Sequence, residues 1–497
     1  MQNAGVNAPA FRCAGCGAVV GAVPCPFRCP NGREGDDIDH VLVPVPMHDT
    51  SWPDAPGPLD GAETFSRYAP LLSSWRLALS RGLSGDEYRR LSVGLDRAVE
   101  AVDGSGFRIT PFIPQERLAA RLGFEEGGRL WVKDETRNVS GSHKARHLMG
   151  VMLYLLVAER AGMSVRLEAA LRLGGPRSGR EGGGPEGISG RPPLAIASCG
   201  NAALAAAVVA RAAEWPLHVF VPPSANPAVL GRLDALGARI TTCHRQPGVA
   251  GDPCYLSFKT ALREGALPFC CQGSDNGLTI EGGETLAWEM VDQVLAGCKP
   301  PAASCQLPDA VFVQVGGGAL ASAVVQGFEA ARRLGVIDRV PAVTAVQTAG
   351  GYPLARAYQR LTARLPGPGG LCRGDVEDAL SYARMHRSEF MWPWEQEPRS
   401  IAHGILDDET YDWAAVVEGL LNSGGRPVVV REERLQEANE LARSLTGIDV
   451  DHTGSAGLAG LMDVLAEEPA LRRARVAVIF SGVRRAADGK KVAGGGR

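Results

Sequence analysis

The sequence lacks the features that would place the protein in a membrane or on a nucleic acid. No apolar run among its 497 residues is as long as the roughly 20 residues that a bilayer crossing needs. Acidic and basic residues nearly balance, 55 against 52, and a formal net charge of −3 gives no electrostatic reason to expect a nucleic-acid or membrane partner. The N-terminus has neither a basic start nor an apolar core, so it does not resemble a signal peptide and we expect a cytoplasmic protein.

Cysteine is too sparse for a secreted protein that depends on disulfides, with 12 in the whole chain. Several lie in or beside apolar segments, where a reduced, buried thiol is the simplest interpretation. These are Cys199, Cys243, Cys270 and Cys271. A second group lies close together near the N-terminus and consists of Cys13, Cys16, Cys25 and Cys29.

Composition divides the chain into three parts. Residues 1–40 are rich in Cys, Pro and Gly and are predicted to form a small appendage. Residues 41–104 are predicted to form an N-terminal extension with one helix near residues 88–102. The remaining residues, 105–497, form the main region, and the chain is long enough that we expect at least two lobes.

Short apolar runs alternate with helical segments from about residue 130 onward. The predicted strands are residues 194–197, 217–221, 238–242, 310–315, 342–346, 427–430 and 476–480. The predicted helices are residues 202–213, 227–236, 283–295, 319–334, 434–445 and 455–465. This alternation requires crossover connections and therefore predicts a doubly wound α/β architecture with mostly parallel sheets. Residues 174–192, rich in Gly and Pro, are predicted to be a mobile surface insertion, and residues 365–370 a second loop.

Three turns in this region have the composition of ligand-binding loops, which in open parallel sheets follow the strands. In the first, residues 133–146, a Gly-Ser turn leads into Lys144. The helix that follows, residues 145–161, is apolar nearly all round and is therefore predicted to be buried. Partial desolvation of Lys144 would favour its neutral, nucleophilic amine. The alternative is a lysine that reaches solvent or pairs with Glu135.

The second turn, residues 198–202, follows a predicted strand and opens an Ala-rich helix. Ser198 is predicted to cap that helix, and Gly200 would let a ligand approach the backbone closely. Asn201 offers both a donor and an acceptor, and the free N–H groups at the helix start suit a carboxylate. A capped turn without a ligand is the alternative.

The third turn contains three consecutive glycines, Gly316 to Gly318, between a strand and a helix. Consecutive glycines expose successive N–H groups to an anion, as phosphate-binding loops do. The turn is neither the dinucleotide-binding fingerprint nor the P-loop, since no Lys-Ser/Thr pair follows the glycines. A tight turn without a ligand remains the alternative.

The order of these segments is more specific than any one of them. A GSxK lysine, an SxGN turn after a strand and a later GGG loop resemble the fold-type II pyridoxal-phosphate enzymes, the group that contains tryptophan synthase β chain, threonine synthase and serine/threonine ammonia-lyases. Residues 280–285 are similar to the group's EGxxT helix start, residues 451–456 to its EPTGA stretch and residues 480–482 to its terminal SG element. The resemblance implies a two-lobed tryptophan synthase β-like fold, with a smaller lobe at about 140–268.

The resemblance also implies a role for individual residues. Lys144 would hold pyridoxal 5'-phosphate as a Schiff base and move the α-proton, Asn201 would hydrogen-bond the ring oxygen, and Ser481 would face the pyridine nitrogen. A neutral hydroxyl at that nitrogen suits β- or γ-elimination and replacement. The phosphate would be cradled by Gly316, Gly317, Gly318, Ala319 and Leu320. The substrate carboxylate would lie near Ser142, Ser198, Cys199, Gly200, Asn201 and Ala202. The smaller lobe would close on the substrate, and a homodimer is expected by analogy.

Threonine synthase is the member whose pattern fits best, because some threonine synthases also carry an N-terminal cysteine pair before the core. Cys13 and Cys16 resemble a zinc knuckle, while Cys25 and Cys29 are one residue farther apart than the usual second pair. Four thiolates would still bind zinc tetrahedrally. A metal-free ribbon is the alternative.

The chain departs from threonine synthases directly around the lysine. Those enzymes usually read GSFKDRG, whereas here His143 and His147 flank Lys144 and Ala145 replaces the acid, which puts a phosphohomoserine substrate in doubt. The two histidines lie one turn apart on one helix face, where either could relay a proton near pH 7. Three arginines could pair a phosphate or a second carboxylate, or simply lie on a solvated face: Arg146, Arg384 and Arg387.

The sequence therefore predicts a threonine synthase-like pyridoxal-phosphate lyase that eliminates or replaces a group at Cβ or Cγ of a small amino acid. A serine/threonine ammonia-lyase is the first alternative, and it would release ammonia and a 2-oxo acid instead of inorganic phosphate. A non-catalytic pyridoxal-phosphate-binding regulatory protein is the second. Its bound cofactor would not respond to any amino acid.

Overall fold

The computed structural model describes most of the chain in eight segments. These are residues 7–33, 35–46, 49–53, 63–165, 190–245, 251–297, 307–366 and 373–485. Most of the predicted insertion at 174–192 and of the predicted loop at 365–370 lies outside them. No helix of the described segments has the length and apolar character that a membrane crossing requires.

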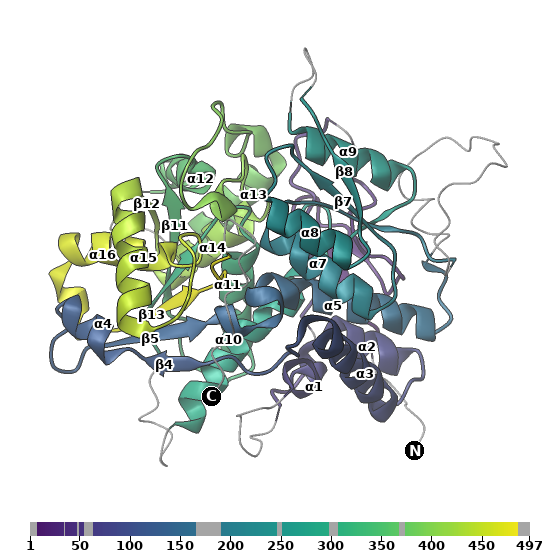
Figure 1. Ribbon diagram of the computed structural model, residues 1–497, viewed down its shortest axis with the longest axis horizontal. Helices are drawn as coiled ribbons and strands as arrows, with labels where there is room; N and C mark the ends of the chain where they lie inside the picture. Colours follow the sequence, from purple (N-terminus) through teal and green to yellow (C-terminus); the bar gives the residue numbers. More distant parts are fainter. Residues whose placement is uncertain are drawn as a thin grey trace.

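The larger lobe is built on a six-stranded sheet in the order β12-β11-β10-β13-β5-β4. Its strands are β4 (Phe112–Pro114), β5 (Arg129–Asp134), β10 (Ala310–Gln314), β11 (Ala342–Thr348), β12 (Pro427–Val430) and β13 (Arg475–Phe480). All neighbours pair in parallel except β4, which runs antiparallel to β5 at the edge. This is the mostly parallel sheet that the sequence predicted, and Figure 1 shows it on the left.

Helices cover both faces of this sheet, which explains its nearly continuous apolar strands. In β10, Val311 and Val313 face one core, while Ala310 and Phe312 face the other. The first core is formed with α10 (Thr279–Ala296), α11 (Ala319–Arg333), α12 (Pro353–Thr362), α13 (Arg373–Met385) and α14 (Trp413–Ser423). The second is formed with α4 (Glu116–Arg121), α15 (Glu432–Thr446) and α16 (Ala456–Glu467).

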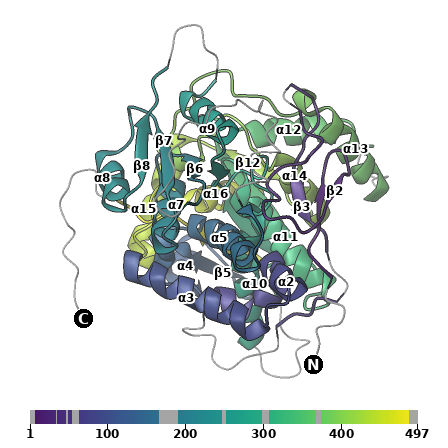
Figure 2. The same cartoon turned by 90° about the vertical axis from the view of Figure 1, so that its right-hand side faces the viewer.

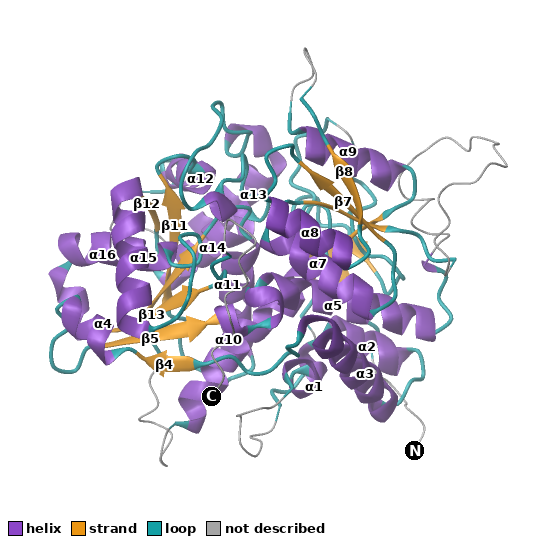
Figure 3. Cartoon of the chain, in the orientation of Figure 1, coloured by secondary structure: helices purple, strands orange, loops and turns teal. Residues whose placement is uncertain are grey.

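The smaller lobe contains a parallel four-stranded sheet in the order β8-β7-β6-β9. Its strands are β6 (Leu194–Ala197), β7 (Leu217–Val221), β8 (Arg239–Thr242) and β9 (Leu267–Pro268). The helices of this lobe are α5 (Lys144–Arg160), α7 (Asn201–Ala212), α8 (Pro227–Ala235) and α9 (Pro253–Arg263). Figure 3 shows both sets of strands enclosed by helices, with α5 and α10 side by side where the lobes meet.

The N-terminal part packs against both lobes. Residues 11–44, called the N-terminal ribbon below, form an antiparallel sheet of β1 (Phe11–Cys13), β2 (Val19–Val20) and β3 (Leu42–Pro44). Three helices follow, α1 (Thr64–Arg67), α2 (Ser73–Ser80) and α3 (Gly85–Asp103), and their apolar residues join the core of the smaller lobe. Figure 2 shows β2 and β3 beside α13 and α14.

Candidate active site

Lys144 begins α5, directly after two short 3-10 turns that follow β5. Gly141 has a positive φ of 71°, and a Cβ there would lie 2.3 Å from Val483, so the turn requires glycine. The backbone N–H of His143 donates to Ser481 Oγ at 3.0 Å, and His143 Nδ1 lies 2.5 Å from the same oxygen. The start of α5 and the end of β13 are therefore held together at the half-buried Lys144.

The second turn brings Asn201 to the same place, but Ser198 does not cap the helix as predicted. Gly200 is the N-cap of α7 and no side chain caps it, since the contact of Ser198 Oγ with the N–H of Gly200 is long, at 3.5 Å. Asn201 accepts a hydrogen bond from Arg485, whose other terminal nitrogen donates to the carbonyl of Ser140 at 2.7 Å. Arg485 thus links the first two turns, and the sequence alone did not single it out.

The glycine loop lies between β10 and α11, and no side chain caps α11 at Gly318, whose φ is 96°. A Cβ on Gly316 would lie 2.4 Å from an Asp407 carboxylate oxygen, and one on Gly317 would lie 2.9 Å from Tyr411. The N–H of Gly317 donates to the Asp407 carboxylate, whose pKa it lowers. A carboxyl oxygen atom therefore lies against this loop, where the exposed N–H groups were predicted to bind an anion.

Three buried acidic groups interact electrostatically with Lys144. Burial raises the pKa of Asp407, and the positive charge of Lys144 opposes that rise. Burial also raises the pKa of Asp412 to about 7, and Lys144 again opposes the rise. Burial likewise raises the pKa of the Cys271 thiol, and the charge of Lys144 opposes that rise. Asp407, Asp412 and Cys271 were not predicted as site residues, since only the folded chain brings them near the lysine.

Comparison with known proteins agrees with this geometry. The family model described as pyridoxal-phosphate dependent enzyme matches residues 105–482. The chain belongs to this family. Pyridoxal phosphate is accordingly its cofactor, and lyases and dehydratases occur among its relatives.

Two curated relatives represent these two reactions. The threonine synthase of Methanocaldococcus jannaschii is 25% identical over 376 residues, which cover 75% of this chain and 74% of that protein. The L-serine dehydratase of Saccharomyces cerevisiae is 30% identical over 175 residues, 35% of this chain and 49% of that protein. Among solved structures, maize serine racemase has the same fold, with a TM-score of 0.51 at 18% identity over 79% of this chain and 95% of that one.

The residues present fit pyridoxal phosphate. The glycine loop and the uncapped start of α11 offer N–H groups to a phosphate. Beside Lys144, the buried Ser142 Oγ and His143 Nε2 have no hydrogen-bond partner within the described chain. Buried polar atoms are normally paired, so these atoms indicate a polar ligand at the start of α5.

The two histidines lie together as predicted, but they are not poised to titrate near pH 7. Their ring centroids are 5.7 Å apart, and both side chains are buried. Burial, reinforced by the charge of Lys144, lowers the pKa of His143 well below its usual value and that of His147 to about 3. Both rings are therefore neutral at pH 7. His147 Nδ1 lies 2.7 Å from the carbonyl of Thr279, which fixes the ring in place.

All three arginines that were considered as phosphate partners form ion pairs within the protein. Arg146 is fully buried and forms ion pairs with Glu135 at 2.8 Å and Glu289 at 2.7 Å. Arg384 pairs with Glu418 at 2.6 Å, and Arg387 pairs with Glu409. Neither of the two alternatives, a ligand partner or a solvated face, holds for Arg146, because its guanidinium is buried and paired within the protein.

Three of the four predicted metal ligands lie together, and the fourth does not. The ligand atoms of Cys13, Cys16, Cys29 and His40 all lie within 4.8 Å of one another. Cys25 is not part of this group, and its thiol donates to the carbonyl of Val165 at 3.8 Å. The side chain that lies beside Cys13, Cys16 and Cys29 is therefore His40 and not the predicted Cys25.

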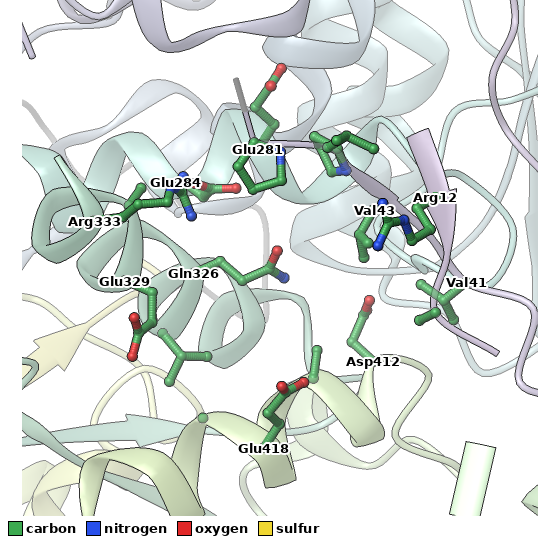
Figure 4. A pocket seen from close by; sticks show the side chains of 18 of the residues that line it. Arg12, Val41, Val43, Glu281, Glu284, Gln326, Glu329, Arg333, Asp412 and Glu418 are labelled. Carbon is green, nitrogen blue, oxygen red and sulfur yellow. The ribbon is translucent and has the colours of Figure 1, made fainter. Parts of the chain in front are cut away.

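A separate cavity of about 1030 Å³ opens beside the N-terminal ribbon. Figure 4 shows Glu284 of α10 and Gln326 of α11 pointing into it, with Asp412 on another side. Neither Lys144 nor any of the three turns lines this cavity. This cavity is therefore separate from Lys144 and the three turns, and Asp412 borders it.

Proposed function

We propose that the chain is a threonine synthase-like pyridoxal-phosphate lyase that eliminates or replaces a group at Cβ or Cγ of a small amino acid. The observation that carries the proposal has two parts. Ser481 bonds His143, directly before Lys144, and Asp407, which interacts electrostatically with Lys144, packs against the glycine loop. A nucleophilic amine, an anion-binding loop and a neutral hydroxyl are the three groups that hold this cofactor. Similarity to threonine synthases over three quarters of the chain supports the reaction class.

Each element of the site would hold a different part of the cofactor. Lys144 would hold it covalently, and the Ser481 hydroxyl would bond the ring nitrogen. Asn201 would donate to the ring oxygen. The phosphate would lie on Gly316, Gly317, Gly318, Ala319 and Leu320. We also propose that the catalytic region spans residues 105–497 with its smaller lobe at about 140–268.

The bound cofactor supplies the electron sink that stabilises negative charge at the α-carbon of the substrate. The chain supplies proton transfer and placement. The amine of Lys144 would remove the α-proton. The substrate carboxylate would bind at the start of α7, where no side chain caps the N–H groups. This binding surface would be formed by Ser142, Ser198, Cys199, Gly200, Asn201 and Ala202.

A serine/threonine ammonia-lyase is the second candidate, and one observation favours it. Burial raises the pKa of Asp412 to about 7, so the protonated carboxyl is accessible near neutral pH. A protonated carboxyl close to Lys144 suits protonation of a departing hydroxyl group. The partial similarity to L-serine dehydratase supports the same reaction.

The deciding experiment compares near-visible absorption spectra of wild type, Lys144→Ala and Lys259→Ala. We expect wild type and Lys259→Ala to show a cofactor band that borohydride bleaches, and Lys144→Ala to lack it. Lys259 is the matched control because it pairs with Asp275 outside the site. A band that persists in Lys144→Ala after dialysis would refute the assignment.

Product analysis then separates the two reactions. Release of inorganic phosphate from a phosphorylated amino acid would support the first candidate. Ammonia and a 2-oxo acid from serine or threonine would support the second. A band that no amino acid changes would contradict both and indicate a non-catalytic cofactor-binding protein.

A further inference from the structure

The N-terminal ribbon brings three thiols and one imidazole together within the described chain. Cys13 ends β1, Cys16 follows one turn later, Cys29 lies in the next loop, and His40 precedes β3. Strand pairing creates the group, because Cys13 is opposite Leu42 in the β1–β3 register. We propose that Cys13, Cys16, Cys29 and His40 bind one zinc ion tetrahedrally, with Asp36 orienting the histidine.

The distances fit this coordination. Zinc bonds of about 2.3 Å to sulfur and about 2.0 Å to nitrogen place tetrahedral ligands about 3.8 Å (S to S) and about 3.5 Å (S to N) apart. Cys16 Sγ lies 3.5 Å from Cys29 Sγ, and Cys13 Sγ lies 3.3 Å from His40 Nδ1. Sulfur atoms joined in a disulfide would be only about 2.05 Å apart, so these cysteines are arranged as free thiols.

The surroundings of the four ligands supply a second, independent argument. His40 Nε2 lies 3.2 Å from a carboxylate oxygen of Asp36, which leaves Nδ1 facing the three sulfur atoms. A metal-binding histidine usually donates its other ring N–H to a carboxylate in this way. The N–H of Cys16 points at Cys13 Sγ at 3.4 Å, and the Asn31 amide at Cys16 Sγ at 3.6 Å. Hydrogen bonds of this kind favour thiolates over thiols.

A bound metal would also stabilise the contact between the N-terminal ribbon and the larger lobe. Directly before His40, the N–H of Asp39 donates to the carbonyl of Arg384 at 2.7 Å. The carboxylate of Asp39 lies 3.4 Å from Arg387, which also pairs with Glu409. Glu409 belongs to the same segment as Asp407. A closed metal site would therefore help to hold this segment through Asp39 and Arg387.

The test is the zinc content of the purified full chain and of single variants. We expect one zinc per chain in wild type and in Cys25→Ser, and at least a tenfold loss of zinc in Cys16→Ser and His40→Ala. His40→Cys should restore binding by supplying a fourth thiolate. Asp36→Asn should keep the ligands but weaken zinc affinity by about 10- to 100-fold.

X-ray absorption of the zinc-loaded wild type should show three sulfur ligands and one nitrogen ligand. Cys25→Ser is the decisive control, because Cys25 is the fourth cysteine of the sequence pattern and lies outside the group. Loss of zinc in Cys25→Ser with retention in His40→Ala would overturn the proposal. So would a wild type that takes up neither Zn²⁺ nor Co²⁺ when they are added. If His40→Ala does not fold, Cys25→Ser and His40→Cys still decide the ligand set.

Discussion

Replacing Arg146 by methionine should destabilise the protein strongly, because it would break a neutral group of four buried charges. Arg146 and Lys133 carry the positive charges, Glu135 and Glu289 the negative ones, and all four side chains are fully buried. Arg146 donates six hydrogen bonds within this group and to two neighbouring threonines. In its absence Lys133 alone would face two carboxylates.

Removing one partner of a buried ion pair costs about 3–5 kcal/mol, since the remaining charge stays desolvated. The unfolding entropy of a unit of roughly 380 residues is about 0.8 kcal/mol/K. Arg146→Met should therefore lower Tm by about 4–6 °C. Differential scanning calorimetry at pH 7 measures this shift.

Arg399→Met is the matched control, because Arg399 also pairs with a glutamate but its side chain is 84% exposed. Exposed pairs contribute little, so its Tm should not change measurably. The double variant Arg146→Met/Glu135→Gln should regain part of the loss, because it removes one uncompensated charge. An Arg146→Met protein as stable as Arg399→Met would refute this account of the buried group.

Two further predictions concern carboxyl groups with raised pKa values. The Asp407→Asn variant should bind pyridoxal phosphate about tenfold more tightly than wild type, because a carboxylate no longer competes with the phosphate for the N–H of Gly317. A titration of the apoprotein with pyridoxal phosphate measures this affinity. Unchanged or weaker binding would contradict the prediction. Burial raises the pKa of Glu284 to about 8, above its value near 4.5 in the unfolded chain. Between pH 4.5 and pH 8 the folded state therefore binds more protons than the unfolded state. The free energy of unfolding should fall as pH rises through this range. Glu284→Gln should flatten that slope in denaturant titrations at pH 5 and pH 8, and an equally steep slope would count against it.

The sequence predicted well the elements that its local pattern defines. Residues 194–197, 217–221 and 427–430 are strands with the expected bounds, since each is a short apolar run between turn residues. The helix start at α10 was predicted four residues late, at 283 instead of Thr279, because its first turn contains two glycines. Helices α12 and α14 were missed, although α12 follows β11 after a short turn that contains Gly350 and Gly351.

The candidate site was predictable where it follows strands and not where distant segments meet. Lys144, Asn201 and Gly316 lie in turns whose composition is unusual, so the sequence identified them. Asp407 approaches Gly317 from a segment about 90 residues away, and nothing in its neighbourhood indicates that contact. Similarly, spacing favoured Cys25 over His40, since the register of β1 with β3 cannot be read from cysteine spacing.

The buried pairing of Arg146 could have been inferred from the sequence. The helix after Lys144 was predicted to be buried on all sides, and an arginine inside such a helix must be paired. The partners were also visible as acids, Glu135 in the preceding turn and Glu289 in the helix that begins with the EGxxT-like segment. Burial therefore argued against Arg146 as a ligand for a substrate phosphate.

The pairing of the arginines bears directly on which leaving group the site would accept. Arg146, Arg384 and Arg387 are each held by glutamates, so a phosphorylated side chain would have to displace one of them. Arg485 differs, because its hydrogen bonds go to neutral groups, Asn201 and the carbonyl of Ser140. It lies beside the start of α7, where it would attract the carboxylate that every amino-acid substrate carries. A phosphorylated side chain would therefore have to displace a glutamate from one of the three arginines, and the phosphate-release assay tests whether it does.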